Sequence, residues 1–184
     1  MAVALLLTTA LALAGFLATS IQGFSVAAGL DAGSAAAKAL VGRHVGYAIP
    51  TVILSLFSQS MVLFYFIGTG RLIKDEVASY PEPERARILS LLRDFKRRTS
   101  PAATFALASA IAVFVLGGAV HTRALPSWVH LASSLLAVLL HAWALAAEWR
   151  VFGENTALMN DPRRYTARTR AGTAVREGGP GRIR

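Results

Sequence analysis

The chain has 184 residues, of which 54% are hydrophobic and only 16% are charged. An ordinary soluble domain carries roughly 25% charged residues, and a soluble globule of this size cannot bury so much apolar surface. This composition excludes a soluble or a disordered protein, and the absence of cysteine excludes disulfide scaffolds, thiolate metal sites and cysteine nucleophiles. The sequence therefore indicates an integral membrane protein.

Four apolar segments contain no Asp, Glu, Lys or Arg, and each is long enough to cross a membrane. They cover residues 2–30, 44–70, 99–122 and 124–147. A helix needs about 20 apolar residues to span a hydrocarbon core of about 30 Å. Their continuous apolar character also differs from the alternating pattern of a membrane β-barrel. We predict an all-α integral membrane protein with four transmembrane helices.

The first two predicted helices cover about residues 2–30 and 45–70. No basic residue precedes the first apolar stretch, which is also longer than the apolar part of a signal peptide, so we expect an uncleaved helix. Pro50 lies one turn inside the second helix, where a transmembrane helix tolerates proline.

The segment at about 83–98, between the second and third transmembrane helices, has amphipathic spacing. Ile88, Leu91, Leu92 and Phe95 recur at i, i+3, i+4 and i+7, and charged residues flank this stripe. We predict a cytoplasmic amphipathic helix that lies along the inner membrane surface with Ile88, Leu92 and Phe95 facing lipid. The alternative is that the same stripe docks on a partner subunit.

The third and fourth transmembrane helices are predicted at about 101–122 and 126–149. Ser100 and Pro101 are typical of a helix start, and the connection at 121–125 is too short for anything but an antiparallel hairpin. The bundle then covers 1–152, and 153–184 forms a basic cytoplasmic tail.

The basic residues are unevenly distributed and predict the topology. Sixteen of the nineteen Lys and Arg residues lie in 71–98 or from 150 onward, and three lie in the other connections. The positive-inside rule then predicts a multi-pass protein of the inner or plasma membrane with both termini in the cytoplasm. The net charge of +9 is explained by topology and by anionic lipid headgroups, so we predict no nucleic-acid partner.

The tail contains a basic cluster that we predict to dock on a partner subunit or on anionic lipid. Its members are Arg163, Arg164, Tyr165, Arg168 and Arg170.

Polar residues at membrane depth are candidates for function by default. His141 lies near the middle of the fourth helix and Gln59 near the middle of the second, whereas His44, His121 and His130 lie at the outer ends. His130 and His141 are about 16 Å apart along one helix and cannot hold one iron. His141 alone, or the His121/His130 pair, is the weak candidate for binding haem, (bacterio)chlorophyll or quinone. The alternative is that His141 forms a hydrogen bond across the bundle, to Gln59 or a serine.

No acidic residue lies within the four apolar segments, so the sequence predicts neither an enzyme nor a proton or cation path. We expect no catalytic residue, no metal site and no resident cofactor. The favoured function is a non-catalytic accessory subunit that packs on and stabilises a larger membrane complex, with a bioenergetic complex, respiratory or photosynthetic, as the favoured host. The alternative is a haem-, pigment- or quinone-binding membrane anchor.

Overall fold

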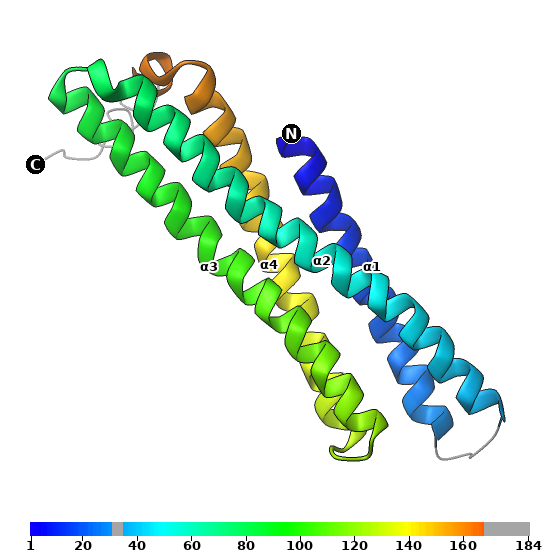
Figure 1. Ribbon diagram of the computed structural model, residues 1–184. Helices are drawn as coiled ribbons and strands as arrows, with labels where there is room; N and C mark the ends of the chain where they lie inside the picture. Colours follow the sequence, from blue (N-terminus) through cyan, green and yellow to red (C-terminus); the bar gives the residue numbers. More distant parts are fainter. Residues whose placement is uncertain (31–34, 168–184) are drawn as a thin grey trace, which may run out of the picture.

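The computed structural model describes residues 1–30 and 35–167, which form four long helices joined by short connections (Figure 1). The helices are α1 (Ala2–Leu30), α2 (Ala35–Glu76), α3 (Glu82–His121) and α4 (Ser127–Asn160), and the 3-10 turn η1 (Val77–Ser79) links α2 to α3. All four are long and apolar enough to cross a membrane. The predicted all-α chain with four membrane-length helices is confirmed to that extent.

The helices run alternately up and down, so that each packs against its neighbours in sequence and α1 also packs against α4. One end of this bundle holds the α2–α3 connection and the C-terminus of α4, and we call it the basic end. The opposite end holds the C-terminus of α1, the start of α2 and the α3–α4 connection. In this arrangement α2 and α4 run parallel and meet across the diagonal of the bundle.

The buried positions of α4 repeat with alternating steps of three and four residues. The repeat consists of Ser134, Ala137, His141, Ala144, Glu148, Val151, Asn155 and Leu158, and Phe152 is buried beside it. A repeat of 3.5 residues, rather than 3.6, keeps one stripe of a helix facing its partners only if the helices supercoil to the left. The bundle therefore packs in the manner of a coiled coil. The alanines Ala102, Ala106 and Ala144 let α3 and α4 approach closely.

The amphipathic segment 83–98 is not a separate helix on the membrane surface, and that prediction is wrong. It is the first part of α3, which continues through Pro101 to His121. Ile88 and Phe95 are 0% and 1% exposed, because the ends of α2 and α4 cover the apolar stripe. Leu92 is partly buried against the same cluster. The spacing identified a buried face correctly, but local periodicity does not say which element covers it.

The basic end contains three helices, because α1 begins well inside the bundle (Figure 1). Leu5 of α1 packs at the level of Tyr65 and Phe152, whereas α2 continues eleven residues past Tyr65 to Glu76, about 16 Å at 1.5 Å per residue. The extension has its own apolar core, formed by Ile73, Val77, Ile88, Phe95, Val151 and Leu158. α4 reaches Asn160, so residues 153–160 belong to this core region rather than to a tail.

Candidate functional site

A row of polar side chains on α4 faces the interior of the bundle at seven-residue intervals. It consists of Ser134, His141, Glu148 and Asn155. Seven residues correspond to about 10.5 Å along a helix, so each member lies in a separate layer with its own neighbours. His130 lies one turn before Ser134, nearer the opposite end.

The first layer is a pair of histidines from the two parallel helices. His44 of α2 and His130 of α4 meet with their ring centroids 6.1 Å apart and their planes at 83°. Both side chains are half-buried, and the Nδ1 atom of each is buried without a hydrogen-bond partner among the described residues. The His44 ring lies beside the backbone carbonyl of Thr19 on α1, and the His130 ring beside that of Val113 on α3.

Glycines provide the space for both imidazoles. Gly23 lies one turn after Thr19, and a Cβ atom there would be 3.6 Å from Cε1 of His44. Gly117 lies one turn after Val113, and a Cβ atom there would be 3.0 Å from Cε1 of His130. The two helical hairpins thus repeat one arrangement, in which a histidine of the second helix lies against a glycine of the first.

The second layer contains His141, which is fully buried and uses both ring nitrogens. Nδ1 is 2.8 Å from the Ala137 carbonyl oxygen, and Nε2 is 2.6 Å from Oγ of Ser55 on α2. Because a carbonyl only accepts, Nδ1 donates its hydrogen and Nε2 accepts from the Ser55 hydroxyl. Phe16 of α1 packs on the ring at 4.4 Å between centroids. Neither nitrogen of His141 is left for a ligand.

The third layer brings together Glu148 of α4, Gln59 of α2 and Thr9 of α1, all 0% exposed. Thr9 and Gln59 face the Glu148 carboxyl, but none of the three side chains has a hydrogen bond of ordinary geometry within the described residues. The sequence placed Glu148 beyond the end of the fourth apolar segment. The structure puts it level with Gln59, near the middle of the second, so the expectation that no acid lies at this depth is corrected.

The fourth layer is an amide and hydroxyl cluster beneath the three-helix extension. Asn155 donates from Nδ2 to the Tyr65 hydroxyl at 3.2 Å and to the Thr69 hydroxyl at 3.1 Å. The Phe66 and Phe152 rings stack beside it with centroids 5.2 Å apart. These polar groups are paired with one another, which gives this layer a structural role in joining α2 to α4.

The predicted His121/His130 pair is not formed. His121 is exposed at the end of α3, and the neighbour of His130 is His44. Sequence reasoning placed His44 at the outer end without including it among the ligand candidates, because the register between α2 and α4 is not visible locally. The seven-residue spacing of His141, Glu148 and Asn155 is visible, and it would have indicated that Glu148 faces inward.

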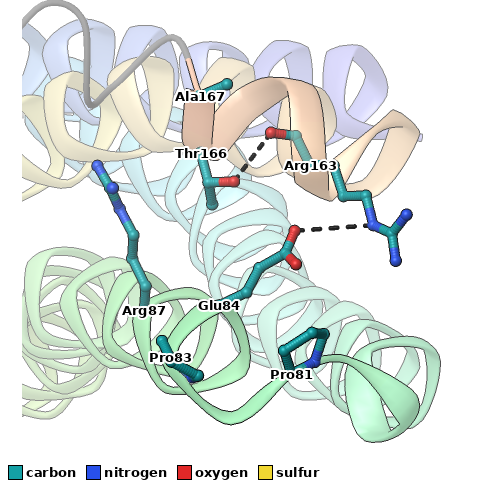
Figure 2. A pocket seen from close by; sticks show the side chains of 7 residues that line it. All are labelled: Pro81, Pro83, Glu84, Arg87, Arg163, Thr166 and Ala167. Carbon is teal, nitrogen blue, oxygen red and sulfur yellow. Dashed lines mark hydrogen bonds and ion pairs between the residues drawn. The ribbon is translucent and has the colours of Figure 1, made fainter.

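The predicted docking cluster at the C-terminal end is partly occupied by contacts within the chain, as Figure 2 shows. Arg163 lies 3.7 Å from the Glu84 carboxylate, and its guanidinium lies 4.7 Å above the Tyr80 ring. Tyr165 packs against the core of the three-helix extension. Burial, together with the nearby Glu154 carboxylate, raises the pKa of Tyr165.

Residues 162–167 form a further helical turn after α4, and a cavity of about 300 Å³ lies between this turn and the start of α3 (Figure 2). Arg164 is exposed, and its backbone N–H donates to the Asp161 carboxylate at 2.8 Å. Arg168 and Arg170 lie outside the described residues.

Comparison of the chain with known protein families, with curated proteins and with solved structures finds no match. The site is therefore interpreted from its own geometry.

Proposed function

We propose that the chain is a membrane subunit that binds haem between His44 and His130. The observation that carries this proposal is the meeting of two imidazoles from parallel helices. The Nδ1 atom of each has no hydrogen bond of ordinary geometry within 1–30 and 35–167, although a backbone carbonyl lies beside each ring. A metal ion held about 2 Å from one nitrogen of each ring brings the ring centroids roughly 6 Å apart. The centroids of His44 and His130 are 6.1 Å apart.

The number of ligands favours haem over a free metal ion. Structural zinc sites use four protein ligands and catalytic sites three, whereas haem brings four nitrogens and needs only axial ligands. Within 1–30 and 35–167, no group of three or more His, Asp or Glu side chains is placed to hold a metal. Two histidines are enough protein ligands to bind haem but too few to bind zinc.

Small residues surround the histidine pair. Gly23 on α1 and Gly117 on α3 leave room for the imidazoles of His44 and His130, which lie against them. Ser20 and Ser134, whose hydroxyls are 3.2 Å apart, supply small side chains one layer further inward. Among the described residues, the exposed Lys38, Arg43 and Arg123 lie at this end of the bundle and would pair with haem propionates.

The positive-inside rule predicts on which side of the membrane the proposed haem lies. The basic end would be cytoplasmic, as would both termini, and the histidine pair would lie near the outer face of the plasma membrane. The subunit would have no catalytic activity of its own and would hold the haem for a partner complex. His141 is not a ligand in this proposal, because Ser55 and Ala137 occupy its nitrogens.

An absorption spectrum of the protein purified in mild detergent from haem-supplemented cells tests the proposal. We expect a Soret band and the sharp α band of a reduced low-spin bis-histidine haem. His44→Ala and His130→Ala should each abolish the low-spin spectrum, while His121→Ala and His141→Gln should retain it. A folded but colourless protein, or a low-spin spectrum unchanged in both ligand variants, would contradict the assignment.

A second candidate function, compatible with the first, is the accessory role in a larger membrane complex. It is supported by an apolar groove of about 390 Å³ between α1 and α4, suited to an apolar helix of another subunit. The groove is lined by Leu6, Leu7, Ala10, Leu13, Ala142, Leu145, Ala146 and Trp149. Filling it with Ala146→Trp should release the chain from a complex with which it co-purifies. The same change at the exposed Ala112 of α3 is the control, and equal retention of both variants would exclude this groove as the contact.

A further inference from the structure

The third layer of the site, which we call the carboxyl layer, combines fully buried side chains with polar atoms that lack hydrogen bonds. Both carboxylate oxygens of Glu148, the carbonyl oxygen and the nitrogen of Gln59, and the hydroxyl oxygen of Thr9 are buried without a hydrogen-bond partner among the described residues. Buried polar atoms in folded proteins are nearly always paired, with protein, water or an ion. Thr9 and Gln59 thus approach the Glu148 carboxyl from two other helices, but neither makes a hydrogen bond of ordinary geometry to it within the described residues.

No positive charge of the described chain compensates the Glu148 carboxyl. The groups that act on it are the side chains of Thr9 and Gln59, and no charged residue is among them. From α3 the neighbouring level of the bundle presents the alanines Ala102 and Ala106, which carry no titratable group. A lone carboxylate in such apolar surroundings is unstable unless it binds a cation or a proton.

The other titratable groups of α4 near Glu148 do not neutralise it. Arg150 is exposed and is not among the groups that act on the Glu148 carboxyl. His141, two turns before Glu148, donates to the Ala137 carbonyl and accepts from Ser55. Glu154, less than two turns after Glu148, pairs with Arg98, which also contacts Asp94. Because these groups are exposed or engaged elsewhere, we expect the charge of the Glu148 carboxylate to be neutralised by a group that is not part of the described chain.

We propose that Glu148, Gln59 and Thr9 form a binding site for one monovalent cation, either a proton or Na⁺. The donor set consists of two carboxylate oxygens, an amide carbonyl oxygen and a hydroxyl oxygen, and hard cations prefer oxygen ligands. A proton on the carboxylate supplies the same unit charge, with the Gln59 carbonyl or the Thr9 hydroxyl accepting its hydrogen bond. The site is separate from the histidine pair, which lies at the other end of the bundle.

The apolar groove between α1 and α4 lies beside this site. Leu6, Ala10 and Leu13 on α1, and Leu145 and Trp149 on α4, line the apolar groove and flank Thr9 and Glu148 in sequence. A hydrophobic carbodiimide, which reacts with protonated carboxyls in apolar surroundings, would approach Glu148 along this groove. The extent of its reaction with Glu148 therefore reports whether the carboxyl carries a proton.

The experiment measures thermal unfolding of the full chain in detergent between pH 5 and 9, in NaCl or in choline chloride. If Na⁺ binds, the midpoint temperature should rise with Na⁺ but not with choline, and Na⁺ should protect Glu148 from carbodiimide modification. If a proton binds, the midpoint should fall as pH rises, and modification of Glu148 should fall in parallel, with no effect of Na⁺. Either response should be lost in Glu148→Gln and retained in Glu82→Gln, whose side chain is 79% exposed.

Two further variants keep the proposal testable if Glu148→Gln does not fold. Thr9→Val and Gln59→Leu each remove one oxygen while retaining the carboxyl, so the Na⁺-dependent or pH-dependent shift should weaken in both. His44→Ala should retain the full shift, which separates this site from haem binding. The proposal is overturned if the folded variants Glu148→Gln, Thr9→Val and Gln59→Leu respond to pH and Na⁺ as the unmodified chain does. It is equally overturned if Glu148 is not modified at any pH.

Discussion

The contact between α1 and α2 gives a sharp prediction at Gly15. A Cβ atom at this position would lie 2.7 Å from Oγ1 and 2.8 Å from Cγ2 of Thr51. The Thr51 hydroxyl donates to the Tyr47 carbonyl oxygen at 2.8 Å, and a β-branched side chain has few alternative rotamers in a helix. Gly15→Ala therefore forces the two helices apart or breaks the Thr51 hydrogen bond.

The expected cost follows from two opposing effects. Overpacking a close contact typically costs about 1–3 kcal/mol, whereas replacing glycine by alanine within a helix gains about 1 kcal/mol. At Gly46 of α2 an added Cβ meets nothing within 4 Å, so Gly46→Ala should show the gain alone. We expect Gly15→Ala to be less stable than Gly46→Ala by about 1–3 kcal/mol.

Unfolding by SDS in mixed micelles, followed by circular dichroism, measures this difference. Thr51→Ala removes the two atoms nearest to the new methyl group and leaves only Cβ, at 3.3 Å, so Gly15→Ala should be better tolerated in that background. The reasoning is refuted if Gly15→Ala and Gly46→Ala have equal free energies of unfolding, or if Thr51→Ala does not relieve the difference.

Three other predictions concern separate parts of the bundle. His141→Leu should cost about 1 kcal/mol of unfolding free energy, the scale of interhelical hydrogen bonds in membranes, and a loss several times larger would indicate another role. Glu154→Gln should cost only about 0.5–1 kcal/mol, and less in high salt, because the Arg98–Glu154 pair is about one-third exposed; equal stability of both chains at low salt would contradict a role for this pair. Reporters inserted near Glu82 and near Arg123 should report opposite sides of the membrane, and a common side would exclude the up-and-down topology.

The sequence was sufficient to predict the number and the approximate positions of the helices, because length and hydropathy are local properties. It did not predict that residues 83–98 continue into α3, since Ser100 and Pro101 also suit a helix start. Pro101 is tolerated because a proline removes one hydrogen bond without ending a helix whose other contacts are strong. The periodicity of 83–98 shows an apolar stripe but does not show whether lipid, a partner subunit or another part of the chain packs against it.

The candidate sites depend on how α2 is aligned with α4 along the bundle, and the sequence of one helix does not reveal this alignment. His44 and His130, Ser55 and His141, and Thr69 and Asn155 are each separated by 86 residues, and all three pairs meet because α2 and α4 run parallel in fixed register. Glu148 directly follows the fourth apolar segment at 124–147, so its position in the sequence alone indicates the end of that segment. Its depth is set by the other helices, whose apolar segments extend further at this level.

The three-helix extension has a mechanical consequence. α2, α3 and α4 pass from the apolar region to the basic end as continuous helices, with no loop between the two parts. A rotation of these helices near Glu148 would therefore move the tip, where Arg163 and Glu84 join the helical turn at 162–167 to α3. The shorter α1 does not reach the tip, so a shift of α1 alone would leave the tip in place. A change in the apolar region would in this way be transmitted to the charged end through three helices.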